Sequence, residues 1–361
     1  MKKKQFFVII FAALILLNCT QKQTASSEKK EIKTMEQTAT GLPQLHQAII
    51  DNNETKVREL IVNGADVNQL DNRMGNAPLH IAAQTDNPKM IDILIDNGAF
   101  VNQMTPRAGH TPLMVAAWYS KGNNIKALLK AKDINIYAKS TNGGAMARDI
   151  IGGWDPSPND NDKKRYDSLR KIIDDYEVSL KENIAGQKIY QVVIDKELTE
   201  DQKLEKVTTL IAAGEPVNTE SYITGNGNDK HSALLVAARD NYPKLVKVLL
   251  DAGADIGQRG YPMNAIAFHK GGYKGNPEVL ELLVAHKDAS KYIDDQGLNN
   301  GYTPLHDAIW HNNPKAAQVL IDAGARLDLK TYEGDTPLDL AKRYNYTEIV
   351  NAIEVKLKKN K

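Results

Sequence analysis

The chain has 361 residues, with 46 lysines and arginines against 45 aspartates and glutamates and a formal net charge of +1. This balance gives no clustered basic face of the kind that nucleic acid needs, so we expect no nucleic-acid partner. The sequence contains one cysteine, which excludes an intramolecular disulfide. The fold must therefore be held by packing alone.

The first 18 residues have the pattern of an export signal. Basic residues 2–4 precede an apolar run, 6–17, which is shorter than the roughly 20 residues that a membrane-spanning helix needs. Residues 16–19, Leu-Leu-Asn-Cys, follow at once and resemble the lipobox of bacterial lipoproteins. The resemblance implies a signal peptide over 1–18 and a lipid such as palmitate on Cys19. The alternative is an ordinary cleaved signal with an incidental cysteine.

Residues 19–40 are predicted to be a flexible tether. They are rich in Thr, Gln, Ser, Lys and Glu and contain no aromatic residue, so they cannot bury enough apolar surface to offset chain entropy. More than one acyl chain on Cys19, as the resemblance implies, would anchor the protein stably. We therefore expect a protein of the bacterial cell envelope, lipid-anchored to a membrane on its periplasmic side or at the cell surface.

From residue 41 onward the sequence repeats itself. Residues 77–83 (APLHIAA) recur 34 residues later at 111–117 (TPLMVAA), and 303–308 (TPLHDA) recur 33 residues later at 336–341 (TPLDLA). Each stretch is followed by a second apolar helix pattern and then a Gly-Ala step, as at Gly253. Thr suits a helix N-cap, Pro the first helical position and Gly a left-handed C-terminal cap.

These motifs resemble the ankyrin repeat. The resemblance implies an all-α solenoid over 41–361, built of about nine helix-turn-helix units with short β-hairpin or loop fingers. The first unit, over 45–68, lacks the Thr-Pro start and suits a cap, and the seventh, over 263–284, aligns poorly. The second, third and fourth units are predicted to begin near Asp71, Arg107 and Asn142, and the fifth spans 184–218. The sixth, eighth and ninth contain the motifs at Ser232, Thr303 and Thr336.

The pattern fails between residues 143 and 230. An insertion over 152–163 precedes a predicted helix over 164–176, and a second insertion covers 223–230. Functional sites are expected where local rules break, but drift in a surface loop costs little stability. Oxygen-bearing side chains in 155–162 do not follow the spacing of a calcium loop, so a solvated loop is the better interpretation.

No catalytic or metal-binding motif is recognisable. The chain has no phosphate-binding glycine loop and no His-Glu-x-x-His, so we expect no enzyme activity, no cofactor and no metal site. Three histidines, His46, His80 and His306, occupy the histidine position of the repeat, where the resemblance implies that the ring bonds backbone between units.

The resemblance also implies where a protein partner would bind: on the finger tips and on exposed first-helix positions that line a concave groove. Trp118-Tyr119 and Trp310-His311 stand out, because aromatic residues are frequent interface anchors; packing between units is the alternative. The candidate residues are Arg73, Arg107, His110, Trp118, Tyr119, Arg239, Tyr302, Trp310, His311 and Tyr332.

Two functional hypotheses follow. The first is a membrane-tethered scaffold that binds an exported or surface protein whose identity the sequence does not give. The second is an immunity or protective protein that neutralises or shields one exported toxin or enzyme.

Overall fold

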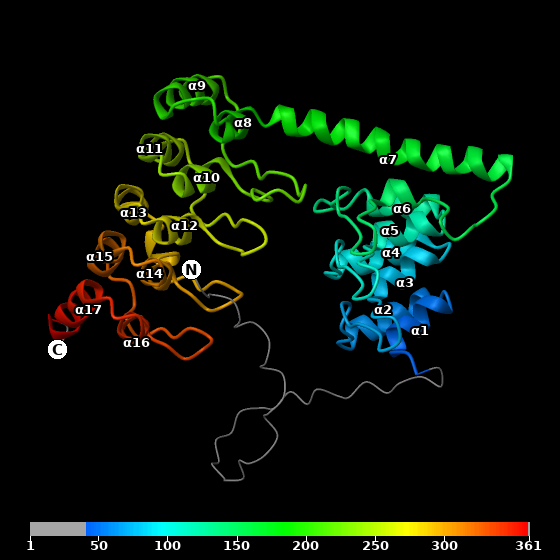
Figure 1. The fold of residues 1–361 in the computed structure, drawn as a ribbon, viewed down its shortest axis with the longest axis horizontal. Coiled ribbons are helices and arrows are strands. Elements are labelled where there is room, and N and C mark those ends of the chain that lie inside the picture. Colours follow the sequence, from blue (N-terminus) through cyan, green and yellow to red (C-terminus); the bar gives the residue numbers. More distant parts are fainter. Residues whose placement is uncertain (1–40, 360–361) are drawn as a thin grey trace, which may run out of the picture. The chain divides into compact units, whose positions relative to one another are not determined.

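A computed structural model describes residues 41–359, and these residues form 17 α-helices and two short 3₁₀ helices, with no β-strand among them (Figure 1). The predicted signal peptide, the lipidated Cys19 and the tether lie outside the described residues. No helix within 41–359 is long and apolar enough to cross a membrane.

The helices follow one another in pairs, which gives nine units and confirms the predicted architecture. The pairs are α1 (Gln44–Ile50) with α2 (Glu54–Val62), α3 (Pro78–Gln84) with α4 (Pro88–Asp96), α5 (Pro112–Trp118) with α6 (Gly122–Leu128), η1 (Ala147–Ile150) with α7 (Asp160–Gly186), α8 (Lys188–Ile194) with α9 (Glu200–Ala212), α10 (Ala233–Arg239) with α11 (Pro243–Asp251), α12 (Ala267–Lys274) with α13 (Pro277–Val284), α14 (Pro304–Trp310) with α15 (Pro314–Asp322), and α16 (Pro337–Arg343) with α17 (Thr347–Lys359). The second 3₁₀ helix, η2 (Ala289–Lys291), lies between α13 and α14.

The Thr-Pro motif starts the first helix of a unit as predicted. The Thr111 side chain accepts a hydrogen bond from the Met114 backbone N–H, and Pro112 takes the first helical position, where no donor is needed. The seventh unit folds regularly although Ile266, the N-cap residue of its helix α12, forms no side-chain cap. A Cβ on Gly272 would lie 2.3 Å from the Pro304 carbonyl oxygen, so glycine permits the close approach of α12 to α14.

Asparagines at the start of second helices tie neighbouring units together. The Asn124 amide donates to the backbone carbonyls of Ala82, Ala83 and Thr85 at 2.7–3.1 Å. Asn276 donates in the same way to Ala238 at 2.8 Å. Each amide satisfies carbonyls at the end of the preceding first helix, which have no partner within their own helix.

The fingers between units are loops. The β-hairpin form expected for some of them is not seen: one isolated bridge, between Gly260 and Ala265, is the nearest approach to a strand pair among residues 41–359. Side chains replace strand pairing. Asn68, for example, donates to the Gly98 carbonyl at 3.0 Å and accepts from the Phe100 N–H at 2.7 Å.

The irregular segment differs from its prediction, because helix α7 runs over 27 residues, Asp160–Gly186, rather than over 164–176. Asn159 ends the inserted loop by capping the helix, with its side chain accepting from the Asn161 and Asp162 N–H groups. Polar residues that suggested a loop thus form the first turn, where acidic side chains favour the helix dipole. The fifth unit consequently begins with α8 rather than at residue 184.

The fifth unit contains a buried lysine. Lys203 is only 2% exposed; its ammonium donates to the Val193 carbonyl at 2.6 Å and lies 4.7 Å from the centroid of the Tyr242 ring. Burial lowers the pKa of Lys203. The side chain therefore joins the end of α8 to the sixth unit through a hydrogen bond and a cation–π contact.

Candidate protein-binding surface

The first helix of each unit presents two positions, the fourth and the seventh, on one face, since residues three apart lie side by side on a helix. In α5 these are Val115 and Trp118, and in α14 they are Asp307 and Trp310. The residue after the helix, Tyr119 or His311, continues the same region. The repeat thereby places the predicted aromatic residues together with the finger that precedes the helix.

The first group, the amino-terminal cluster, consists of Arg107, His110, Trp118 and Tyr119. These four predicted residues line one hollow of about 250 Å³, and the His110 and Trp118 ring centroids are 6.1 Å apart. Burial lowers the pKa of His110 and so favours its neutral ring. With Tyr119 42% exposed, the hollow offers aromatic surface to a partner.

Trp118 also has a packing role, which was the alternative interpretation. A Cβ on Gly153 would lie 2.4 Å from two atoms of the Trp118 ring. The backbone of the inserted loop therefore approaches Trp118 so closely that only glycine fits there. Part of this ring is committed to the fold, whereas Tyr119 is free to contact a partner.

The second group, the carboxyl-terminal cluster, consists of Tyr273, Tyr302, Asp307, Trp310 and His311. Its rings are in mutual contact: centroids are 5.8 Å apart for Tyr302 and Trp310, 4.7 Å for Trp310 and His311, and 3.9 Å for Tyr273 and His311. Trp310 is 45% exposed. The structure thus brings together three predicted residues and adds Tyr273 and Asp307, which the sequence analysis did not select.

Asp307 is the unusual member of this cluster. At the same helical position α3, α5, α10 and α16 carry the aliphatic residues Ile81, Val115, Val236 and Leu340, whereas α12 carries Lys270. The Asp307 carboxylate is half-buried and forms no hydrogen bond or ion pair with another residue of 41–359. Burial raises its pKa to about 7, against the opposing effect of Lys270. This departure from the repeat pattern was the signal that could have identified it.

The other three predicted residues lie apart from these clusters. Arg73 and Tyr332 are on exposed fingers, and Tyr332 packs over Gly301 while its N–H donates to the Asn300 carbonyl at 2.9 Å. The Arg239 guanidinium is bound within the chain, to Asp240 at 2.6 and 2.8 Å and to Asn228. A partner could use Arg239 only by replacing these contacts.

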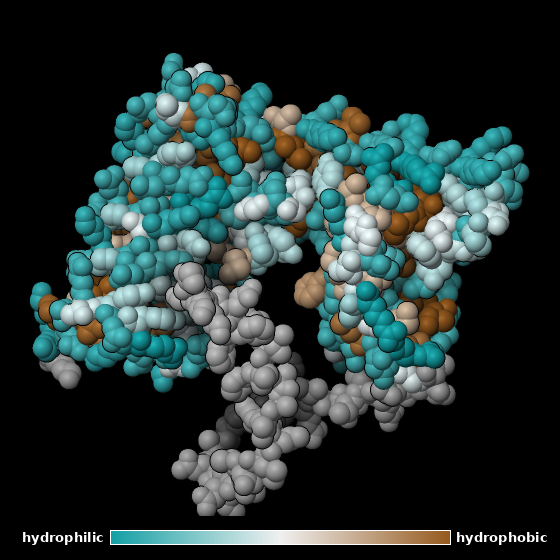
Figure 2. Space-filling view, in the orientation of Figure 1, coloured by the Kyte–Doolittle hydropathy of each residue, from teal (hydrophilic) through white to brown (hydrophobic). Residues whose placement is uncertain are grey.

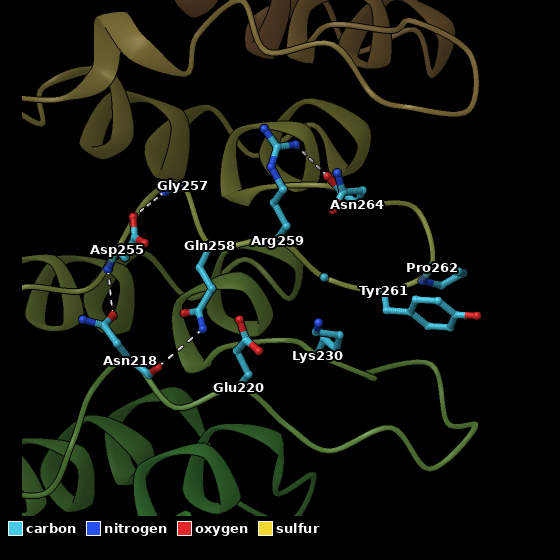
Figure 3. Close-up of a pocket in the computed structure, with 11 residues that line it drawn as sticks. Asn218, Glu220, Lys230, Asp255, Gly257, Gln258, Arg259, Tyr261, Pro262 and Asn264 are labelled. Atoms are coloured by element: carbon cyan, nitrogen blue, oxygen red, sulfur yellow. Dashed lines mark hydrogen bonds between the residues drawn. The ribbon is translucent and has the colours of Figure 1, made fainter. Parts of the chain in front are cut away.

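A larger hollow, of about 530 Å³, lies between the fingers that precede α10 and α12 (Figure 3). Its lining is polar, but the charges are paired internally: Arg259 bonds Asp295 at 2.5 Å and Lys230 bonds Asp133 at 2.9 Å. Asn218 likewise accepts from the Asp255 N–H. These contacts hold the fingers in place.

The histidines of the repeat position behave largely as the resemblance implies. His46 bonds the Asn76 carbonyl at 2.9 Å and His80 bonds the carbonyls of Gln103 and His110 at 2.9 and 3.0 Å. His269, missed because its unit lacks Thr-Pro-Leu, bonds the Tyr302 carbonyl at 3.2 Å. Within residues 41–359 no group of three or more His, Cys, Asp or Glu side chains is arranged to hold a metal ion.

Comparison with known proteins gives a consistent result. A family model described as ankyrin repeats in three copies matches residues 45–140, 234–331 and 263–359. The rat cyclin-dependent kinase 4 inhibitor B is 32% identical over 131 residues, which cover 35% of this chain and 91% of that protein. A Rickettsia bellii ankyrin repeat protein is 35% identical over 83 residues, or 22% of this chain and 49% of its own length.

Other similar proteins are matched over a smaller share of their length. The ankyrin repeat protein FPV031 of fowlpox virus is 29% identical over 160 residues, which cover 43% of this chain and 45% of the viral protein. The phosphocholine transferase AnkX of Legionella pneumophila is 32% identical over 116 residues, which cover 32% of this chain and 12% of the enzyme. The matched part of the enzyme is thus a small fraction of it.

Proposed function

Because the chain belongs to the ankyrin-repeat family, whose members generally bind proteins and are generally not catalytic, we propose that it is a protein-binding scaffold held at a bacterial membrane. The partner is an exported or surface protein, and the amino-terminal and carboxyl-terminal clusters are the surfaces that hold it. Preformed helices limit the ordering entropy lost on binding.

The observation that carries this proposal is the grouping of exposed aromatic residues on first helices. Tyr119 and Trp310 are 42% and 45% exposed; Tyr119 lines one hollow with His110 and Trp118, and the Trp310 ring lies beside that of His311. Most of the face of the stack seen in Figure 2 is hydrophilic, with hydrophobic patches beside α7. Aromatic side chains at such places are the residues most often found as anchors of interfaces.

Membrane attachment rests on the sequence before residue 41. The single cysteine follows an apolar run at the place where a lipobox has it, and lipid chains on Cys19 would supply the anchor. Replacing Cys19 by Ser should move the protein from the membrane fraction to the soluble fraction, because no acyl chain can be attached. Equal membrane retention of both proteins would contradict the anchor.

Partner binding is tested by capture from the native membrane fraction followed by mass spectrometry. Tyr119→Ala and Trp310→Ala should each reduce recovery of the same protein, while the far-ultraviolet circular dichroism stays unchanged. Trp154→Ala is the matched control, because Trp154 is 49% exposed and belongs to neither cluster. Undiminished recovery with both cluster variants would refute the proposed surfaces.

The second candidate, a protective or immunity protein, is supported by the match to the rat kinase inhibitor, in which a protein similar to 35% of this chain inhibits an enzyme. The same capture experiment separates the two candidates. A single captured enzyme or toxin whose activity falls on binding would favour the protective role over the general scaffold.

A further inference from the structure

The carboxyl-terminal cluster holds a carboxylate that lacks a partner. Asp307 lies on α14 one helical turn before Trp310, and its neighbour on α12, Lys270, forms no ion pair with it among residues 41–359. Asp307 is half-buried, Lys270 acts on it by its charge only, and a half-buried carboxylate without a hydrogen bond gains from a donor. Because part of the carboxylate remains open to solvent, that donor can arrive from outside the chain.

Apart from Lys270, the charges around Asp307 are used within the protein. On the side of α16 and its finger, Arg343 pairs with Glu333 at 3.3 Å and with Asp335. On the side of α12, Lys274 lies over the Tyr273 ring, 5.7 Å from its centroid. Burial lowers the pKa of His306 on α14 to about 4, and it also lowers the pKa of His311, which follows the helix.

Acidic side chains lie close to Tyr302. Burial raises the pKa of Tyr302, and the charges of Glu333 and Asp307 raise it further. A group that arrives here therefore meets acidic side chains and the faces of aromatic rings together. Both features favour a cation.

We propose that Asp307, Tyr302 and Trp310 form the anchor point for one basic side chain, an arginine, of the protein partner. The inference rests on the proposed function and specifies the chemistry of the bound segment. The guanidinium bonds the Asp307 carboxylate, and its flat face stacks on the exposed ring of Trp310. Arginine suits this arrangement better than lysine, because its planar group can bond a carboxylate and stack on an aromatic ring at the same time.

The test uses the whole chain labelled with ¹⁵N-tryptophan, which gives three indole signals for its three tryptophans. Single Trp→Phe variants assign these signals. Titration with N-acetyl-arginine methylamide should shift the Trp310 signal saturably and leave those of Trp118 and Trp154 in place. Asp307→Asn should weaken binding about tenfold or more, which corresponds to about 1.4 kcal/mol. The uncharged N-acetyl-citrulline methylamide should give no saturable shift.

Asp86→Asn is the matched control, since Asp86 is an exposed acid outside the cluster, and it should bind the probe as the wild type does. A titration without a saturable Trp310 shift, or with the same affinity in Asp307→Asn, would overturn the proposal. The partner capture described above distinguishes failure of the arginine anchor from failure of the proposed scaffold function. Recovery lost with Trp310→Ala but kept with Asp307→Asn leaves the scaffold function standing and removes the arginine anchor.

Discussion

Replacing Asp307 by Asn should make the protein more stable at neutral pH and change little at acidic pH. The folded protein keeps a proton on this carboxyl up to about pH 7, whereas the unfolded chain releases it near the ordinary value of 3.8. The stabilising effect of this proton is thus complete below about pH 4 and is lost as the pH rises through 7. Asn cannot titrate, so it avoids the cost of an ionised, covered carboxylate.

The size of the effect follows from the two pKa values. A change from 3.8 to about 7 corresponds to at most about 4 kcal/mol of unfolding free energy. Asp307 is partly reached by solvent, which screens its charge, so we expect about 1–3 kcal/mol. The unfolding free energy of Asp307→Asn minus that of the wild type should therefore be larger at pH 8 than at pH 4 by this amount.

The assay is urea unfolding of both proteins at the two pH values, monitored by circular dichroism and by the fluorescence of Trp310. For the fluorescence measurement, Trp118 and Trp154 are replaced by Phe. Groups whose pKa the charge of Asp307 does not shift, such as His306 and His311, behave alike in both proteins and cancel in the difference. Asp86→Asn, which removes an exposed carboxylate, should show no comparable growth with pH. A stability difference for Asp307→Asn that is the same at pH 4 and pH 8 would refute the reasoning.

Three further variants test the packing of the stack. Asn124→Ala removes three hydrogen bonds to buried carbonyls and should cost about 1–3 kcal/mol in urea unfolding; an unchanged midpoint would show that water replaces the amide. Lys203→Ala leaves a cavity and an unpaired Val193 carbonyl, and its melting temperature should fall by an amount equivalent to about 2–4 kcal/mol. Gly153→Ala should cost about 1–3 kcal/mol through contact with the Trp118 ring, and the cost should shrink when Trp118 is Ala in the same chain; additive losses would argue against that contact.

The regular units could be predicted because the repeat motif carries its own physical reasons. Thr111 and Pro112 begin α5 where the pattern places a helix start. The seventh unit was harder, since Ile266 replaces the capping Thr and Gly271-Gly272 replaces the usual alanine pair. Tertiary packing on α14 compensates for both, and a single sequence does not display such contacts.

The inserted segment was mispredicted for a local reason. Residues 160–163, Asp-Asn-Asp-Lys, favour loops by composition, yet the Asn159 cap and the helix dipole turn them into a first helical turn. Beyond residue 176 the helix continues with the same buried face, through Leu180, until Gly186. Its length depends on that packing rather than on an end signal in the sequence.

The sequence predicted only part of the candidate surface, because the remaining contacts depend on how the chain packs. Aromatic type and repeat position were enough to select Trp118 and Trp310, but the pairing of Arg239 with Asp240 and Asn228 depends on geometry. Asp307 was overlooked because an acidic residue on a helix usually faces water. Only the cover supplied by its neighbours makes this carboxylate unusual.

The buried hydrophobic cluster that begins at Ile189 in α8 and continues to Ile353 in α17 unites the last five units. In a repeat array each unit is stabilised by its nearest neighbours, so unfolding spreads along unbroken contact. The long helix α7 comes directly before this cluster and takes the place of an ordinary second helix. We therefore expect the last five units to open and close as one cooperative block. In hydrogen exchange, amides of α8 and α14 should then share one opening free energy, and those of α3 and α5 should follow another.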